Sequence, residues 1–530
     1  MKIGNQKWKY LWGSLLVLAA LVLVFTYICQ TGWSFYNSDC ADSLFWAQAS
    51  YEAKSLFNKD FIYACTLPFG GQWFFLPFIG LFGMTMKTQI LGMCLFLLVF
   101  SLSLFFFLKV FGLTLPQSLS ALAGILMVLS LSDKLREIFW GHVLYYSCAV
   151  LGIQIFLLLF ILYEKYRKAQ RTKVQWLLLS LLCIWTLLVS ANGASVLSIS
   201  VLPLLVGIAG ERFLDERPFS WQEERPFLLL MGALVLSLLA GYWLHGRLTA
   251  GYTADYEDGY MIYTAISNWE GNQLRLLPYW VQLLGFTPSG EDILSLSGLS
   301  LLIKLCAGIA FILIPILLLV FYKKVSDRMS RIYILMHWTL TGILLFGWLY
   351  GELASAGWRL SPLVYSSCIM TIIFLRLSFQ QLKKLQWKRV GVLLLLGIFL
   401  TGLTAAGDLC TLPRDYRQVN HLYAVADFLE SQDLSYGYST FWEANALTVI
   451  SDSQVKARGI RIEGAGYTIE PYQTSLIWYE DQPGIQQYFV LLKTSHYYEM
   501  LENGNILTES AISIHQVEDF TILIFDKNIF

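Results

Sequence analysis

Two aspartates follow the first long apolar run of the chain, in the stretch FYNSDCADSLFWAQASYEAKSLF, residues 35–57. Neither Asp39 nor Asp42 has a basic residue close to it in the sequence. A carboxylate of this kind can act as a general base that takes a proton from a reacting hydroxyl. The alternative is structural, because an aspartate at a helix start stabilises the helix by about 1 kcal/mol. Apolar positions from Leu44 to Leu56 predict a helix, and Asp39 is its expected N-cap.

A second polar group lies in LSDKLREIFWGHVLYYS, residues 131–147, which holds Asp133, Glu137 and His142. Asp, Glu and His are ligand types for divalent cations, although these three are not at a spacing diagnostic of a metal site. A divalent cation is therefore left open as a cofactor, and no metal ligand is assigned. His142 also fits an ordinary hydrogen-bonded histidine at a membrane interface.

Residues 245–296 are rich in Tyr and Trp and contain His245, Arg247 and Arg275. Aromatic faces with scattered hydrogen-bonding groups suit sugar rings and isoprenoid chains. They suit the aromatic belt of a membrane interface equally well. Arg247 and Arg275 are retained as substrate-binding residues beside that second interpretation.

The composition shows which kind of protein positions these residues. Hydrophobic residues make up 56% of the 530, charged residues only 14%, and the mean hydropathy is +0.56. Such values exceed those of soluble globular chains and indicate a polytopic α-helical membrane protein. The formal net charge is zero, so no global field favours nucleic acid, and nucleic-acid binding is excluded.

A helix needs about 20 apolar residues to cross a bilayer. Segments that satisfy this rule, with the shorter ones included, predict about eleven spans, at 11–29, 88–108, 115–131, 143–163, 176–190, 195–210, 227–244, 297–322, 332–350, 362–380 and 390–407. The pair 176–190 and 195–210 also fits one re-entrant hairpin. The apolar stretch 66–86 is interrupted by Pro and Gly and is expected to be interfacial or a partial span.

Orientation follows from Lys and Arg, which gather in the short segments 2–9, 165–173, 323–331 and 383–389. Basic loops face the cytoplasm, so we expect a multi-pass plasma-membrane protein with a cytoplasmic N-terminus. The expected exported loops are 30–87, 132–142, 245–296 and 351–361. Cys40 and Cys65 share the first of them, where a disulfide would form if the compartment is oxidising.

The composition becomes that of a soluble domain near residue 407. Helical spacing over 416–432 and β-rich runs at 486–493 and 519–526 predict a small α/β domain. The expected division is a transmembrane domain over 1–407 and an exported domain over 408–530.

The acidic first loop, the many spans and the soluble tail together resemble the GT-C superfamily of polytopic glycosyltransferases, which includes protein O-mannosyltransferases and aminoarabinose transferases. The stretch NSDCADS matches the essential first-loop aspartate of such enzymes, and Asp39 is the closer match. GWRLSPLVYSSC, residues 357–368, resembles their Arg-aromatic-x-x-Pro turn, with Leu360 in place of tyrosine. YGYSTFWEANALTVISDSQVKA, residues 436–457, resembles a Gly-Tyr-x-x-x-Trp segment of exported bacterial domains.

This resemblance implies sugar transfer from a polyprenyl-phosphate donor to a lipid, polysaccharide or protein acceptor outside the cell. Asp39, with Asp42 as the second choice, would be the general base, and Arg359 would hold the phosphate, since its planar fork donates two hydrogen bonds. An interfacial arginine that anchors a helix end and binds no ligand fits Arg359 equally well. Asp133 and Glu137 match an acidic residue that helps to build the site, and His142 would orient a phosphate or acceptor.

Three other functions fit parts of the pattern. A flippase or transporter of lipid-linked saccharides would place charges near mid-membrane, and here they lie mostly in loops. A polysaccharide polymerase or ligase also uses polyprenyl-linked sugars but usually depends on a large exported loop bearing Arg and His. A non-catalytic scaffold whose tail binds a partner is the third.

Overall fold

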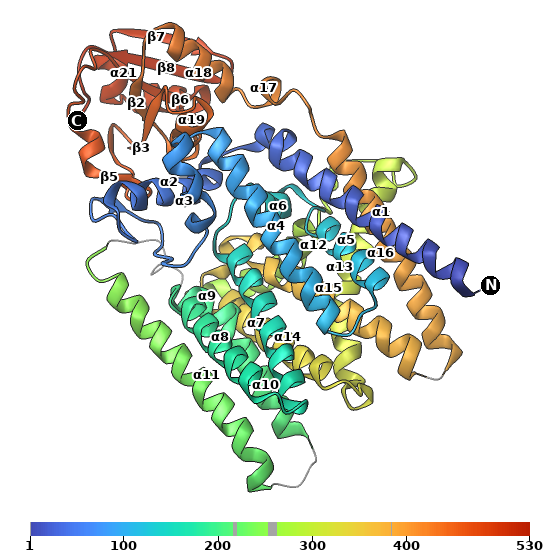
Figure 1. The fold of residues 1–530 in the computed structure, drawn as a ribbon. Helices are drawn as coiled ribbons and strands as arrows, with labels where there is room; N and C mark the ends of the chain where they lie inside the picture. The colour runs from blue at the N-terminus through green and yellow to red at the C-terminus, as the bar shows by residue number, and fades with distance from the viewer. Residues whose placement is uncertain (1, 216–219, 253–261, 383) are drawn as a thin grey trace.

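The computed structural model describes residues 2–215, 220–252, 262–382 and 384–530. Part of the predicted loop 245–296, residues 253–261, lies outside them, as does Lys383. Helices form a bundle that carries a sheet-containing domain at one end, drawn in orange and red in Figure 1. The predicted fold class, a polytopic helical protein with a C-terminal α/β domain, is confirmed.

Among the described residues, ten helices are long and apolar enough to cross a membrane. An eleventh span is reached if α5 and the helical segment Asp133–Gly141, which meet at a bend of 115°, together count as one. The predicted spans therefore match, and α8 and the α9–α10 pair qualify as separate spans. The bundle and its connections contain α1 (Lys2–Cys29), α2 (Ser38–Ala53), α3 (Gln72–Phe82), α4 (Met86–Val110), α5 (Leu115–Val128), α6 (Asp133–Arg136), α7 (Tyr145–Lys168), α8 (Thr172–Ser190), α9 (Gly193–Ile199), α10 (Val201–Leu214), α11 (Trp221–Leu248), α12 (Trp269–Leu283), α13 (Leu296–Val320), α14 (Arg328–Tyr350), α15 (Ser361–Arg376) and α16 (Leu385–Thr411).

The spanning helices differ in how much of their surface the protein covers. The span that contains α15 is 83% buried over its most apolar window, whereas those of α11 and α16 are 17% buried. A helix can face lipid because all its backbone hydrogen bonds are internal. Helix α15 is thus the centre of the bundle, and α11 and α16 present most of their apolar side chains outward.

The helix after the first span starts two residues earlier than predicted. Asn37, not Asp39, is the N-cap of α2: its backbone is extended and its side chain accepts a hydrogen bond from the Cys40 N–H at 3.3 Å. Asn caps helices about as well as Asp. Asp39 lies inside the first turn, so its carboxylate is available for another role.

The rest of the first loop packs under the C-terminal domain. The interrupted stretch 66–86 forms only the short helix α3, whose eleven residues extend about 16 Å and cannot cross a bilayer. The chain leaves α3 at Gly83, where φ is +66°, a value that suits glycine. Cys40 is a buried thiol outside any disulfide, so the bond with Cys65 that the sequence left open does not form.

The C-terminal domain is a six-stranded mixed sheet in the order β4-β3-β2-β6-β8-β7, with β2 parallel to β3 and β6. Its strands are β2 (Tyr436–Ser439), β3 (Lys456–Glu463), β4 (Gly466–Ile469), β6 (Tyr488–Lys493), β7 (Ser513–Val517) and β8 (Phe520–Phe525), and its helices are α17 (Tyr416–Val419), α18 (Leu422–Ser431), α19 (Phe441–Ile450), α20 (Thr494–Glu502) and α21 (Ile506–Ser510). The predicted helix over 416–432 is broken at Asn420, whose amide donates to the Trp33 carbonyl at 3.0 Å.

Hydrogen bonds tie this domain to the first loop. Strands β1 (Phe61–Ile62) and β5 (Thr474–Ser475) pair across more than 400 residues of sequence. The Trp46 indole donates to the Gln473 side chain at 2.6 Å, and the N–H of Met86 donates to Asp452 at 3.0 Å. The C-terminal domain is therefore fixed against α2, the helix that carries Asp39 and Asp42.

Candidate active site

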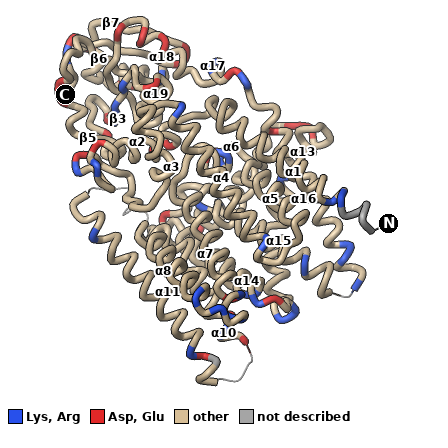
Figure 2. The backbone as a smooth tube through the Cα atoms, viewed as in Figure 1, with Lys and Arg blue, Asp and Glu red and all other residues tan. Residues whose placement is uncertain are grey.

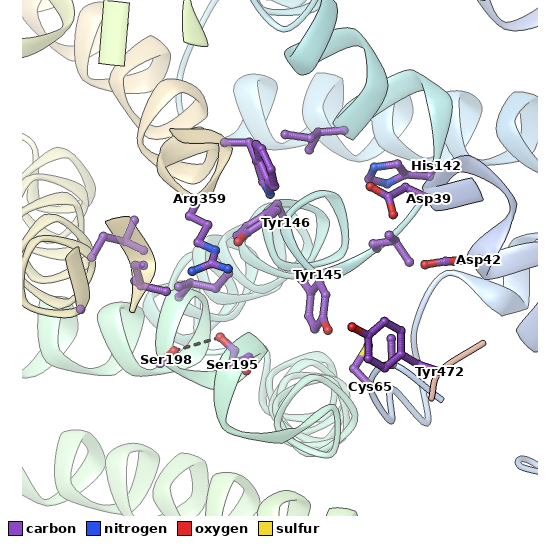
Figure 3. A pocket seen from close by; sticks show the side chains of 18 of the residues that line it. Asp39, Asp42, Cys65, His142, Tyr145, Tyr146, Ser195, Ser198, Arg359 and Tyr472 are labelled. Carbon is purple, nitrogen blue, oxygen red and sulfur yellow. Dashed lines mark hydrogen bonds between the residues drawn. The ribbon is translucent and has the colours of Figure 1, made fainter. Parts of the chain in front are cut away.

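A cavity of 810 Å³ lies where the helix bundle meets the C-terminal domain. Five of the residues predicted from the sequence line it: Asp39, Asp42, Glu137, His142 and Arg359. Figure 3 draws the aspartates and the histidine on one side of the cavity and the arginine across from them. The fold thus gathers residues separated by more than 300 positions in the sequence.

Asp39 reaches the cavity from the first turn of α2, where the positive end of the helix dipole favours a carboxylate. Burial, with the nearby charge of Glu137, raises its pKa to about 6, and the opposite charge of Lys134 opposes that rise. An efficient general base has a pKa close to the pH at which it works. Asp39 can therefore accept a proton near neutral pH.

Asp42 lies one turn further along α2 and is only 5% exposed. Burial raises its pKa well above the ordinary range, the charge of Asp39 raises it further, and the neighbouring Gln473 side chain opposes the rise. Two close carboxyls in a dry site do not ionise together. Asp42 therefore loses its proton less readily than Asp39, and Asp39 is the carboxyl of the pair that ionises first.

The second acidic group, Glu137, is held by its neighbours. Lys134 donates to it at 2.5 Å and also lies 4.3 Å from the centre of the Trp358 ring. The imidazole of His142 is 3.9 Å from the same carboxylate, and burial lowers the pKa of His142 to about 3, so the ring is neutral. Glu137 begins a five-residue π-helical turn, and His142 follows it directly.

Arg359 is 5% exposed and sits in a 3₁₀ turn immediately before α15. Its guanidinium donates to the carbonyl of Glu352 at 2.6 Å, which fixes the side chain in the cavity wall. Pro362 stands at the start of α15, where a missing N–H costs nothing. The buried guanidinium makes this side of the cavity suitable for an anion.

Three predicted site residues lie elsewhere. Asp133 is exposed and pairs with Arg136 on the next turn. Arg247 is exposed at the end of α11, 5.4 Å from the Trp243 ring, and Arg275 is exposed on α12. The structure does not bring any of the three to the lining of this cavity.

The C-terminal domain supplies cavity residues that the sequence did not single out. They are Phe441, Trp442, Arg461, Glu470 and Tyr472. Trp442 ends the Gly-Tyr-x-x-x-Trp segment noted in the sequence, which was a usable signal. Nothing in the sequence near Arg461, Glu470 or Tyr472 indicated a site, because tertiary packing alone brings β3 and the chain after β4 to the cavity.

Whether the protein could hold a divalent cation depends on the side chains that are available as ligands. Within the described ranges, no group of three or more His, Cys, Asp or Glu side chains is arranged to hold a metal ion. The Glu137 carboxylate is already bound by Lys134. These residues do not fit a metal site, and no catalytic step is assigned to one.

Comparison with protein-family models gives no match, and neither does comparison with curated proteins. A crystal structure of ArnT from Cupriavidus metallidurans in the apo state superposes with a TM-score of 0.55 over 97% of each chain, at 9% sequence identity. The chain therefore shares the overall fold of ArnT. The polytopic fold expected from the sequence resemblance is confirmed, and the likeness to ArnT covers the bundle and the C-terminal domain alike.

Proposed function

We propose that this protein is a membrane glycosyltransferase that moves a sugar from a polyprenyl-phosphate donor to a cell-envelope acceptor at the outer face of the membrane. The observation that carries the proposal is the cavity in which a carboxylate of raised pKa, Asp39, faces a buried arginine, Arg359. The fold shared with ArnT supports the same proposal.

Asp39 is the proposed general base. As the acceptor hydroxyl attacks the anomeric carbon of the donor, its proton passes to the Asp39 carboxylate and the bond from the sugar to the phosphate breaks. The raised pKa of Asp39 makes it a stronger base than an exposed aspartate. Asp42, which ionises after Asp39, and the Lys134–Glu137 pair set the charge around it.

Arg359 is the proposed partner of the leaving phosphate. The phosphate gains negative charge as the glycosidic bond breaks, and preorganised donors aimed at such a charge lower the barrier. A guanidinium donates two parallel hydrogen bonds to phosphate oxygens and remains charged throughout. Its fixation by Glu352 and its place before α15 mean that little reorganisation is needed.

The membrane side of the cavity suits an isoprenoid chain. Apolar side chains of α7, α9 and α14 line it together with their flanking segments: Leu144, Ile199, Ile343, Leu344, Phe346 and Leu353. Burial of such a chain against these residues would contribute about 25 cal/mol per Å². The donor would thus be held by its lipid here and by its phosphate at Arg359.

The distribution of basic residues supports the proposed orientation. Figure 2 shows Lys and Arg gathered at the ends of the helices away from the C-terminal domain. By the positive-inside tendency that end faces the cytoplasm. We accordingly place residues 1–407 in and at the plasma membrane, residues 408–530 outside, and the cavity at the outer surface.

The test is transfer by purified protein in lipid nanodiscs, supplied with labelled polyprenyl-phosphate sugars and envelope extracts as acceptors. Asp39→Asn keeps the size of the side chain and removes the base, so transfer should fall about a hundredfold or more. Asp42→Asn, which replaces the carboxyl that ionises second, should lose less. Equal transfer by wild type and Asp39→Asn would contradict the proposed mechanism.

A further inference from the structure

One wall of the cavity differs in chemistry from the membrane side. It consists of Phe441, Trp442, Arg461, Glu470 and Tyr472, all from the C-terminal domain, and is called the aromatic wall below. The Phe441 ring lies 5.3 Å from Trp442 and 6.1 Å from Tyr472, centre to centre. Three aromatic rings are therefore clustered at a site that also contains charged groups.

The charged groups of the aromatic wall are paired and partly open to solvent. Arg461 donates to Glu470 at 3.1 Å and lies 3.4 Å from the Tyr472 hydroxyl. Its side chain is 43% exposed, whereas that of Glu470 is 7% exposed. The guanidinium thus retains donors that can reach a ligand, since five N–H groups are available on one arginine.

Trp442 is the most exposed ring of the wall, at 53%, although it belongs to a helix whose next eight residues are all buried. An indole in that position leaves a flat apolar face in the cavity. Aromatic faces beside hydrogen-bonding groups accommodate a ring that is apolar on one side and carries hydroxyls at its edge. A sugar is such a ring.

A lipid tail fits this wall poorly. Covering the Arg461–Glu470 pair with hydrocarbon would remove water from two charges without replacing its hydrogen bonds, which is costly. The apolar residues of α9 and α14 provide a better surface for hydrocarbon elsewhere in the same cavity. The apolar residues of α9 and α14 therefore suit a lipid chain, and the aromatic wall suits a sugar.

We propose that the aromatic wall binds the carbohydrate part of the acceptor, with a sugar ring on Trp442 and its hydroxyls on Arg461 and Tyr472. This inference rests on the proposed transfer reaction and makes it more specific, because it names a sugar-containing acceptor and assigns acceptor selection to the C-terminal domain. In Figure 3 Tyr472 lies on the same side of the cavity as Asp42, so an acceptor held here would approach the carboxylates.

The experiment measures binding separately from transfer. Full-length protein in nanodiscs is applied to an array of immobilised bacterial cell-envelope oligosaccharides, and binding of undecaprenyl phosphate is measured in parallel. Wild type should bind at least one oligosaccharide saturably. Trp442→Ala should weaken that binding tenfold or more and leave undecaprenyl-phosphate affinity within twofold, whereas Trp442→Phe, which keeps an aromatic face, should stay within about threefold of wild type.

Matched variants on the same domain control for general damage. Tyr498→Ala removes a ring that is 57% exposed but outside the cavity lining, and it should bind glycans as wild type does. Arg461→Lys keeps the charge beside Glu470 but loses the planar fork, and it should cost at least fivefold. Arg417→Lys makes the same change in the exposed pair with Asp427 and should cost nothing.

The outcomes separate this inference from the proposed function. Glycan binding that depends on Trp442 supports the inference even if Asp39→Asn leaves transfer unchanged and the mechanism is abandoned. No saturable glycan binding by wild type, as expected for a lipid or protein acceptor without sugar, would overturn it. An equal loss in Tyr498→Ala, or binding that Trp442→Ala leaves intact, would also overturn it.

Discussion

The raised pKa of Asp39 predicts that the protein is less stable with this carboxylate than without it. Its pKa rises from an ordinary 3.8 to about 6 in the folded chain. The folded state therefore holds the proton over a pH range in which the unfolded chain has lost it. Stability is unaffected below pH 3.8, falls as the pH rises from there to about 6, and stays reduced above.

The size of the effect follows from the same values. At about 1.36 kcal/mol per pH unit, the rise corresponds to about 3 kcal/mol above pH 6. The interaction of the carboxylate with the helix dipole is already contained in that pKa. Asp39→Asn should then stabilise the protein by about 3 kcal/mol at pH 7.5 and by less at pH 5.

The assay is the apparent melting temperature of purified protein in nanodiscs at pH 5 and pH 7.5. Asp39→Asn should melt higher than wild type, with a larger difference at pH 7.5. Asp60→Asn, an exposed aspartate in the same first loop, should match wild type at both values. A lower melting temperature of Asp39→Asn at pH 7.5 would refute the reasoning and favour a purely structural role for the carboxylate.

Two more predictions concern the groups around the cavity. Arg359→Gln should lower kcat/KM for the polyprenyl-phosphate donor about 10- to 100-fold, because hydrogen bonds from a charged group to the leaving phosphate contribute about 1.5 to 3 kcal/mol; an unchanged kcat/KM in steady-state kinetics would count against the phosphate role. Gln473→Leu leaves the buried Trp46 N–H without its acceptor and should cost about 1 to 3 kcal/mol of stability, seen as a lower melting temperature, while Gln432→Leu, at an exposed site, should have no effect.

The spans and the fold class were predictable because they depend on local properties. About 20 apolar residues in a row must cross the bilayer wherever the rest of the chain lies. The first-loop aspartate and the arginine before α15 were found by resemblance to GT-C motifs, and the structure brings Asp39 and Arg359 to one cavity. The cap of α2 was misplaced, since Asn37 and Asp39 are equally good capping residues and only backbone conformation decides between them.

The remainder of the site depends on contacts that have no local signature. Pairing of Phe61 with Ser475 joins two-residue strands that neither segment predicts alone. That pairing and the Trp46–Gln473 bond seat the C-terminal domain, which is why Arg461 and Tyr472 reach a cavity formed mostly by helices. Conversely, Arg247 and Arg275 looked suitable by residue type, but their helices point them elsewhere.

The measurement that tests the central claim most directly is the pH dependence of polyprenyl-phosphate release from a labelled polyprenyl-phosphate sugar, for reconstituted wild type and Asp39→Asn in the presence of acceptor. If Asp39 is the base, the wild-type kcat/KM rises tenfold per pH unit below about 6 and levels off above, where the carboxylate is ionised. The variant should be about a hundredfold slower or worse at pH 7.5 and lack the inflection. The same inflection and the same rate in Asp39→Asn would contradict the account.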